Sequence, residues 1–124
     1  MILLPMPPGN NRYYRHYRGV TVLSAEGEAF KRDAGWICKA GGMKVLHGPV
    51  ELMVILHPRQ NKDGSSSRAR LDLDGCLKAV CDALNGIGYA DDRWIERLVA
   101  EVGEPMVMGG VSVQVRSVDM GVKN

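Results

Sequence analysis

Five carboxylates and one internal lysine lie between residues 70 and 94, in a segment that otherwise has the pattern of a buried helix. Asp72 and Asp74 are two residues apart, just before an apolar repeat. A second pair, Asp91 and Asp92, follows the repeat after a glycine-containing turn. Magnesium prefers oxygen ligands and keeps several waters, so two or three carboxylates on a rigid frame can hold it. The segment therefore predicts a site for a hard divalent metal ion.

Apolar residues at spacings of three and four predict a helix between the two acidic pairs. They are Leu73, Leu77, Val80, Cys81 and Leu84. Asp72 is expected to cap this helix, and Asp74 lies in its first turn, four residues before Lys78 on the same face. About twelve helical residues span roughly 18 Å. Asp92 can therefore join the first pair only if the chain doubles back after Gly88 and a strand returns beside the helix start.

Basic residues are concentrated in two parts of a chain whose formal net charge is only +2. No acidic residue precedes Glu26, whereas three arginines do, and the stretch 59–70 carries four basic residues against Asp63 alone. The basic residues of the two parts are Arg12, Arg15 and Arg18, and Arg59, Lys62, Arg68 and Arg70. Positive regions beside a carboxylate cluster fit a polyanionic substrate brought to a metal ion.

Aromatic residues alternate with arginines between Pro7 and Gly19. Arginines neutralise phosphates and tyrosines stack on exposed bases, so this mixture suits DNA with unstacked or branched bases. The alternative is a surface turn whose tyrosines cover the edge of the core. With the second basic stretch, DNA contact is the favoured interpretation. The predicted DNA-binding residues are Arg12, Tyr13, Tyr14, Arg15, Arg18, Lys62, Arg68 and Arg70.

The cysteines indicate a reducing compartment and no zinc site. Cys38, Cys76 and Cys81 lie in apolar helical patterns without a C-x-x-C pair, so we expect buried free thiols. The first residues, M-I-L-L-P, are too short for a signal peptide or a membrane span. We therefore expect a cytoplasmic protein. His57, at the end of an apolar run, is expected to be structural.

The 124 residues are expected to form a single domain, 1–124, of the α/β (α+β) class, with two helices packed on a mixed β-sheet. Apolar runs and alternation predict strands at Ile2–Met6, Val20–Leu23, Pro49–Pro58, Trp94–Val102 and Gly110–Val118. Helices are expected from Ser24 to about Lys39 and from Asp72 to Leu84. The strand at Pro49–Pro58 is expected to be buried on both faces. A crossover through the second helix should connect it to the strand at Trp94–Val102. The segment from Arg59 to Arg70 has the composition of a flexible loop.

Three stretches resemble the RusA family of Holliday junction resolvases, in the family's order along the chain. They are P-M-P-P-G-N-N-R-Y-Y-R-H from Pro5, L-S-A-E-G from Leu23 and D-L-D-G-C-L-K-A-V-C-D-A-L-N-G-I-G-Y-A-D-D from Asp72. The resemblance implies a Mg²⁺-dependent endodeoxyribonuclease, with Mn²⁺ as an alternative ion. It also implies a homodimer that nicks two opposed strands of a four-way junction in recombination and repair.

The same resemblance implies roles for individual residues. Asp72, Asp74 and Asp92 would bind the metal ion, Lys78 would be the catalytic lysine, and Asp91 would support Asp92. This chain has Gly75 where the family usually has asparagine, and Leu71 where a basic residue is common. We expect Arg68 or Arg70 to supply the missing contacts to the scissile phosphate. The alternatives are a nuclease for flaps or other branched DNA and a non-catalytic DNA-binding protein.

Overall fold

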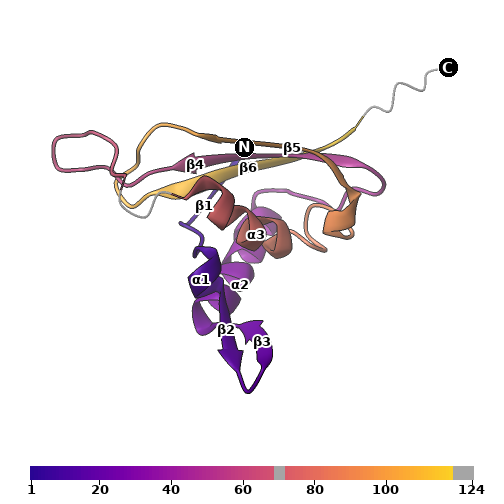
Figure 1. Ribbon diagram of the computed structural model, residues 1–124. Coiled ribbons are helices and arrows are strands. Elements are labelled where there is room, and N and C mark those ends of the chain that lie inside the picture. The colour runs from indigo at the N-terminus through magenta and orange to yellow at the C-terminus, as the bar shows by residue number, and fades with distance from the viewer. Residues whose placement is uncertain (69–71, 119–124) are drawn as a thin grey trace.

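Three helices and six strands, with one short 3-10 turn, make up the described part of the chain in this computed structural model, which covers residues 1–68 and 72–118 (Figure 1). In chain order they are β1 (Ile2–Leu4), α1 (Asn10–Tyr13), β2 (Tyr14–Tyr17), β3 (Val20–Leu23), α2 (Ala25–Ala40), β4 (Val50–His57), α3 (Leu73–Ala83), η1 (Asp92–Trp94), β5 (Ile95–Val102) and β6 (Gly110–Ser117). None of the helices in these ranges is long and apolar enough to cross a membrane.

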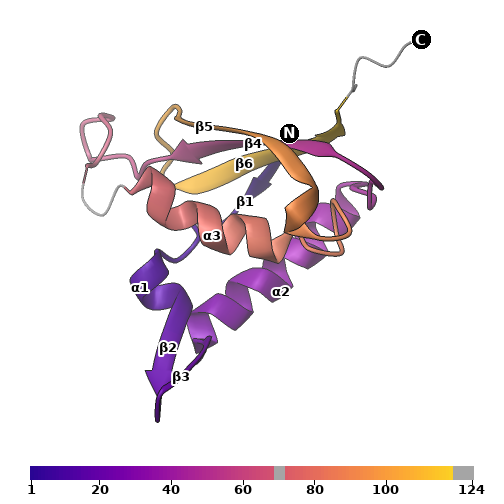
Figure 2. The ribbon, with the colours of Figure 1, turned by 45° about the vertical axis from the view of Figure 1, so that its right-hand side comes forward.

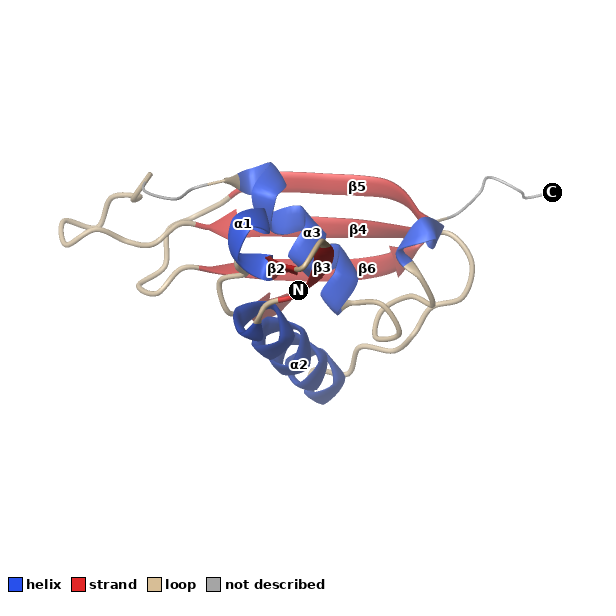
Figure 3. Cartoon of the chain, turned by 60° about the horizontal axis from the view of Figure 1, so that its bottom comes forward, coloured by secondary structure: helices blue, strands red, loops and turns tan. Residues whose placement is uncertain are grey.

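The main sheet is mixed, with the strand order β1-β6-β4-β5. β4 pairs antiparallel with β6 and parallel with β5, so that Val50 lies opposite Ile95 and Leu56 opposite Val102. The parallel pair requires the chain to cross back between the two strands, and α3 makes this crossing. Both α2 and α3 lie on the same face of the sheet (Figures 1 and 3). The predicted α/β (α+β) architecture with two helices on a mixed sheet is confirmed.

Alternation along β4 shows which face of the sheet is covered. Val50, Leu52, Val54 and Leu56 are at most 2% exposed and belong to the core beneath the helices. The residues between them from Met53 onward are only half-buried, so the prediction that this strand is buried on both faces is wrong. The physical reason is that the helices of the described ranges all lie on the first face and leave the second face without a covering layer (Figure 1).

Glu51 lies on this second face of β4 and is nevertheless 5% exposed. The Nε atoms of Arg97 and Arg116, on the two neighbouring strands, both pair with its carboxylate. A buried carboxylate is costly without such partners, so the two arginines are what allow Glu51 to sit there.

Val20–Leu23 forms a strand as predicted, but it joins a separate two-stranded sheet with β2. Tyr14 lies opposite Leu23 and Tyr17 opposite Val20. The turn between the strands places Arg18 at a φ of 50° and Gly19 at a φ of 76°, the positive values that a tight hairpin turn requires. Figures 1 and 2 show this hairpin projecting away from the main sheet.

Candidate active site

The start of α3 presents two carboxylates to solvent. Asp72 caps the helix as predicted, because its side chain accepts a hydrogen bond from the Gly75 amide at 3.1 Å. Asp74 follows in the first turn, where a negative charge is favourable beside the helix dipole. Both aspartates are exposed, and so is Lys78, one turn further along the helix. Two carboxylates and one ammonium group therefore face solvent over the first turns of this helix.

Lys78 has no acidic partner in the described ranges, where no ion pair within 4.0 Å includes it. A lysine with a purely structural role at this position would pair with a nearby acid on the same helix, Asp74 or Asp82. Asp82 instead lies 3.9 Å from the Nζ of Lys31 and accepts a hydrogen bond from Tyr13. The ammonium of Lys78 thus remains available to a ligand bound beside Asp74.

Gly75 makes room for the capping carboxylate. A Cβ at this position would lie 2.1 Å from Oδ2 of Asp72, much closer than real side chains allow. Any other residue here, including the asparagine usual in the resembling family, would require the Asp72 carboxylate to rotate off the cap. The glycine therefore determines where one of the two acids points.

A double-mutant cycle tests this coupling between Asp72 and Gly75. Gly75→Ala should lose the cap, at about 1 kcal/mol, and gain a similar amount of helix propensity, so the free energy of unfolding should change by less than about 0.5 kcal/mol. Asp72→Ala should cost about 1 kcal/mol in the parent chain and almost nothing in the Gly75→Ala chain. Urea denaturation measures all four stabilities. Equal costs of Asp72→Ala in both backgrounds would show that the two positions are independent.

Asp92 lies at the opposite end of α3 from Asp72 and Asp74. Asp92 is the first residue of η1, the short turn that leads directly into β5. This turn lies beside the C-terminal half of α3 (Figure 2). Burial raises the pKa of the Cys81 thiol, and the Asp92 charge raises it further. The pKa of Cys76, near the helix start, is raised to about 11, first by burial and then by Asp72. Each thiol thus responds to the acid at its own end of the helix.

One chain alone does not bring the three predicted metal ligands together. Within residues 1–68 and 72–118, no group of three or more His, Cys, Asp or Glu side chains is placed to hold a metal ion. A three-carboxylate site within one chain would require Asp92 to lie beside the start of α3, and it does not. Because β5 runs parallel to β4, it begins where α3 ends, and only its last residues reach the edge where α3 begins.

Asp91 holds the turn that presents Asp92. Its side chain accepts a hydrogen bond from the Arg93 amide at 2.9 Å and caps η1. A carboxylate held in this way fixes the backbone on either side of its neighbour. The supporting role predicted for Asp91 has a local structural counterpart in this turn.

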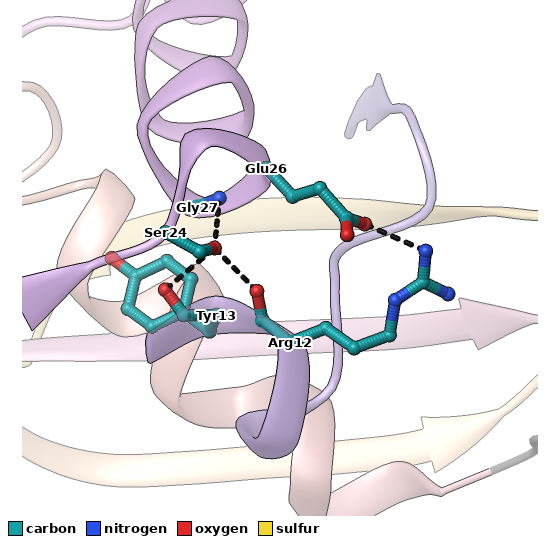
Figure 4. A network of polar contacts seen from close by, with 5 residues as sticks. All are labelled: Arg12, Tyr13, Ser24, Glu26 and Gly27. Carbon is teal, nitrogen blue, oxygen red and sulfur yellow. Dashed lines mark hydrogen bonds and ion pairs between the residues drawn. The ribbon is translucent and has the colours of Figure 1, made fainter. Parts of the chain in front are cut away.

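Tyr13 is not available to DNA bases, so its predicted contact is wrong. The residue is fully buried, and its hydroxyl donates a hydrogen bond to Asp82 of α3. Its backbone carbonyl accepts from Ser24, the residue that caps α2 (Figure 4). Tyr14 is half-buried and meets the Tyr13 ring edge-on at 4.8 Å. For these two residues the alternative of tyrosines that cover the core edge is the better description.

Removing the Tyr13 hydroxyl should lower stability without weakening DNA binding. Tyr13→Phe loses a buried hydrogen bond to a carboxylate, which should cost about 1.5 kcal/mol in the free energy of unfolding at neutral pH. Thermal or urea denaturation measures this loss, and a junction-binding assay should show no change. Weaker junction binding by a folded variant would indicate that Tyr13 does contribute to DNA binding.

The same variant should alter stability at high pH. Burial raises the pKa of both the Tyr13 and Tyr89 phenols, and Asp82 raises that of Tyr13 further. The unfolded chain loses these protons near pH 10 while the folded chain keeps them, so stability should fall as the pH rises above about 10. In Tyr13→Phe the fall should be shallower by up to about 1.4 kcal/mol per pH unit. An unchanged slope in urea denaturation at several alkaline pH values would contradict this assignment.

The predicted arginines of the N-terminal segment are exposed. Arg12 pairs with Glu26 at 2.8 Å (Figure 4), and Arg15 projects from the hairpin. The guanidinium of Arg18 lies 5.3 Å from the centre of the Tyr17 ring at the hairpin tip. Tyr17 was absent from the predicted contacts, yet it is 58% exposed. Its place next to Arg18 repeats the alternation of tyrosine and arginine that marked the segment.

The second basic stretch is more regular than its composition predicted. The backbone amide of Ser67 donates to Arg59, and that of Asn61 donates to Ser65, so this stretch folds back on itself. Lys62 and Arg68 are exposed, and the predicted contact at Arg70 lies outside the described residues.

His57 is structural, as predicted. One ring nitrogen lies 2.8 Å from the Glu104 carbonyl and the other 2.8 Å from the Ser112 hydroxyl. The side chain thus ties the end of β4 to the connection between β5 and β6.

Comparison with known proteins identifies the family. Residues 5–116 match the family model described as Endodeoxyribonuclease RusA. The chain is 39% identical over 114 residues to a crossover junction endodeoxyribonuclease RusA of Escherichia coli O139:H28, covering 88% of this chain and 86% of that protein. It is 38% identical over 112 residues to the proteins of that name from Enterobacteria phage 82 and Escherichia coli K12, with the same coverage. The chain therefore belongs to the RusA family of endodeoxyribonucleases.

Proposed function

We propose that this protein is a Holliday junction resolvase, an endodeoxyribonuclease that hydrolyses one phosphodiester in each of two opposed strands of a four-way DNA junction in recombination and repair. The observation that carries this proposal is the family match over nearly the whole chain. Asp72 at the cap of α3 and the pair Asp74 and Lys78, four residues apart on one helix face, are all exposed and supply the chemistry that such an activity needs. Three free thiols fit a reducing cytoplasm.

The active site is proposed to be shared between two copies of the chain. Asp72 and Asp74 lie at one end of α3 and Asp92 at the other, and eleven helical residues separate them by about 16 Å. A two-fold axis across the middle of α3 would bring Asp92 of each copy to the acidic pair of the other. Such a homodimer has two identical sites, the number that paired symmetric nicks require.

The donor set fits a hard divalent ion. Carboxylate oxygens suit Mg²⁺, with Mn²⁺ as an alternative, and the exposed position of Asp72 and Asp74 leaves room for the waters that Mg²⁺ retains. When bound, the ion would supply a water of lowered pKa and stabilise charge on the phosphate. Asp72, held at the helix end, and Asp74 would hold the ion together with Asp92, and Asp91 fixes the turn that carries Asp92.

Lys78 acts on the substrate side of the same helix face. Its ammonium lies one turn from Asp74 and, within the described ranges, is free of acidic partners. In this position it neutralises the negative charge that develops on the phosphate oxygens, or orients the attacking water. Arg12, Arg15, Arg18, Lys62 and Arg68, with Arg70, are proposed to contact the phosphates of the junction arms.

A comparison of substrates tests the proposal. Rates of cleavage in Mg²⁺ should be highest on a mobile four-way junction, lower on a flap and lowest on linear duplex. Equal rates on junction and flap would favour a general branched-DNA nuclease. Junction binding with no cleavage in Mg²⁺ or Mn²⁺ would favour a non-catalytic DNA-binding protein.

A further inference from the structure

Two large apolar side chains stand in solvent at the tip of the connection between β5 and β6. Val107 is 73% exposed and Met108 70%. Among the large apolar residues of the described ranges, only Trp36, near the C-terminal end of α2, is exposed to a similar degree. These two adjacent side chains form one small contiguous apolar surface, which is a candidate contact surface for another molecule.

The tip is held in place by backbone hydrogen bonds. The Met106 amide donates to Pro58 at 2.8 Å, the Met106 carbonyl accepts from Gln60 at 2.8 Å, and the Gly109 amide donates to Met106 at 3.0 Å. Gly109 has a φ of 71°, which turns the chain back into β6. Val107 and Met108 therefore project from a fixed turn.

Basic side chains flank this turn. The Arg59 Cγ lies 3.3 Å from where a Cβ on Gly109 would be, so the arginine stem packs against the tip. Lys62 is exposed in the same basic stretch, which is joined to the tip by the bonds from Pro58 and Gln60. The exposed basic residues of this stretch, Arg59, Lys62 and Arg68, outnumber the exposed acids beside the tip, Asp63 and Glu104, so the surroundings of the apolar pair favour a polyanion over an apolar protein surface.

The tip lies at the edge of the sheet where α3 begins. β4 and β5 are parallel and end together, and β6 starts at the same edge. The chain leaves β4 there, forms the basic stretch and enters α3 at Asp72 and Asp74. Figure 1 shows the basic stretch and the β5–β6 connection side by side at the left.

We infer that Val107 and Met108 insert between bases of the bound DNA and unstack them beside the acidic pair. Proteins that distort DNA use apolar side chains in this way, with basic neighbours that hold the backbone. Opening the base stack would kink the sugar–phosphate backbone beside Asp72, Asp74 and Lys78. This inference rests on the proposed function, and it makes the tip a determinant of which DNA structures are cut.

Junctions that carry 2-aminopurine at single positions around the branch test the inference in EDTA, where no cleavage occurs. The parent protein should raise the fluorescence roughly twofold or more at one or more positions, because unstacked 2-aminopurine is brighter. Val107→Ser/Met108→Ser should abolish the rise and slow cleavage in Mg²⁺ about tenfold. Junction affinity should stay within about threefold, since phosphate contacts dominate it.

Trp36→Ser is the matched control, because it removes an equally exposed apolar side chain away from this edge, and it should behave as the parent protein does. No rise with the parent protein, or an equal rise with the double variant, would overturn the inference. Light scattering that shows a dimer for the parent protein and a monomer for the double variant would also overturn it, since the tip would then be a subunit contact. Failure of the parent protein to cut junctions in Mg²⁺ would defeat the proposed function, while the fluorescence would still decide the role of the tip.

Discussion

Chains carrying Asp74→Asn and chains carrying Asp92→Asn should each be inactive alone and regain junction nicking when assembled together. Each single variant removes a proposed metal ligand, which should slow cleavage about 100-fold or more. In a shared-site dimer, the mixed pair has one site in which Asp72, Asp74 and Asp92 are all intact. Random assembly makes half of the dimers mixed, so roughly a quarter of the parental sites should return. Gel analysis of nicked junctions measures the recovery.

The matched control for this experiment is a mixture of Asp72→Asn and Asp74→Asn chains. Both substitutions lie at the same end of α3, so no combination of these chains restores a complete site, and nicking should stay at the level of the single variants. Mixed Asp74→Asn and Asp92→Asn dimers, verified by mass, that still fail to nick would contradict the shared site. Junction binding by all three variants in EDTA confirms that the chains are folded.

Lys78→Ala should slow cleavage about 100-fold to 1000-fold while leaving junction affinity in EDTA within about threefold. The large effect is expected because a cation placed where charge develops acts mainly in the transition state. Loss of this lysine costs little stability, since no ion pair in the described ranges depends on it. Single-turnover cleavage of pre-bound junctions measures the chemical step directly.

Lys39→Ala is the control for this variant, because Lys39 is also an exposed helical lysine but lies on α2, at the end of that helix. It should cleave at the parental rate. Parental single-turnover rates for the Lys78→Ala protein would show that Lys78 has no catalytic role. An equal loss in both variants would indicate a general effect of charge on DNA binding.

Local patterns in the sequence were sufficient to predict α3 and its cap. The three-and-four spacing of apolar residues predicts a helix with one buried face, and helical geometry then places Asp74 and Lys78 together one turn apart, with Asp72 as the cap. The cap of α2 by Ser24 and the strand at β4 are predicted for similar local reasons. In each case the cause lies within a few residues of its effect.

Contacts between distant residues were beyond such patterns. The spacing of Tyr13 and Tyr14 among arginines is equally consistent with DNA stacking and with packing, and only the position of α3 decides that Tyr13 is buried on Asp82. Similarly, β3 has the pattern of a core strand, and only its pairing with β2 shows that it belongs to a projecting hairpin. Alternation shows that a strand exists but not which strand it joins.

The sequence by itself determined which residue types could bind a metal ion and that two of them, Asp72 and Asp74, share the start of one helix. Only the tertiary structure decided the position of Asp92. The physical reason is the parallel pairing of β4 and β5, which forces α3 to run back along the sheet and places the residue before β5 at the far end of the helix. That same pairing is what makes a second copy of the chain necessary to complete the proposed site.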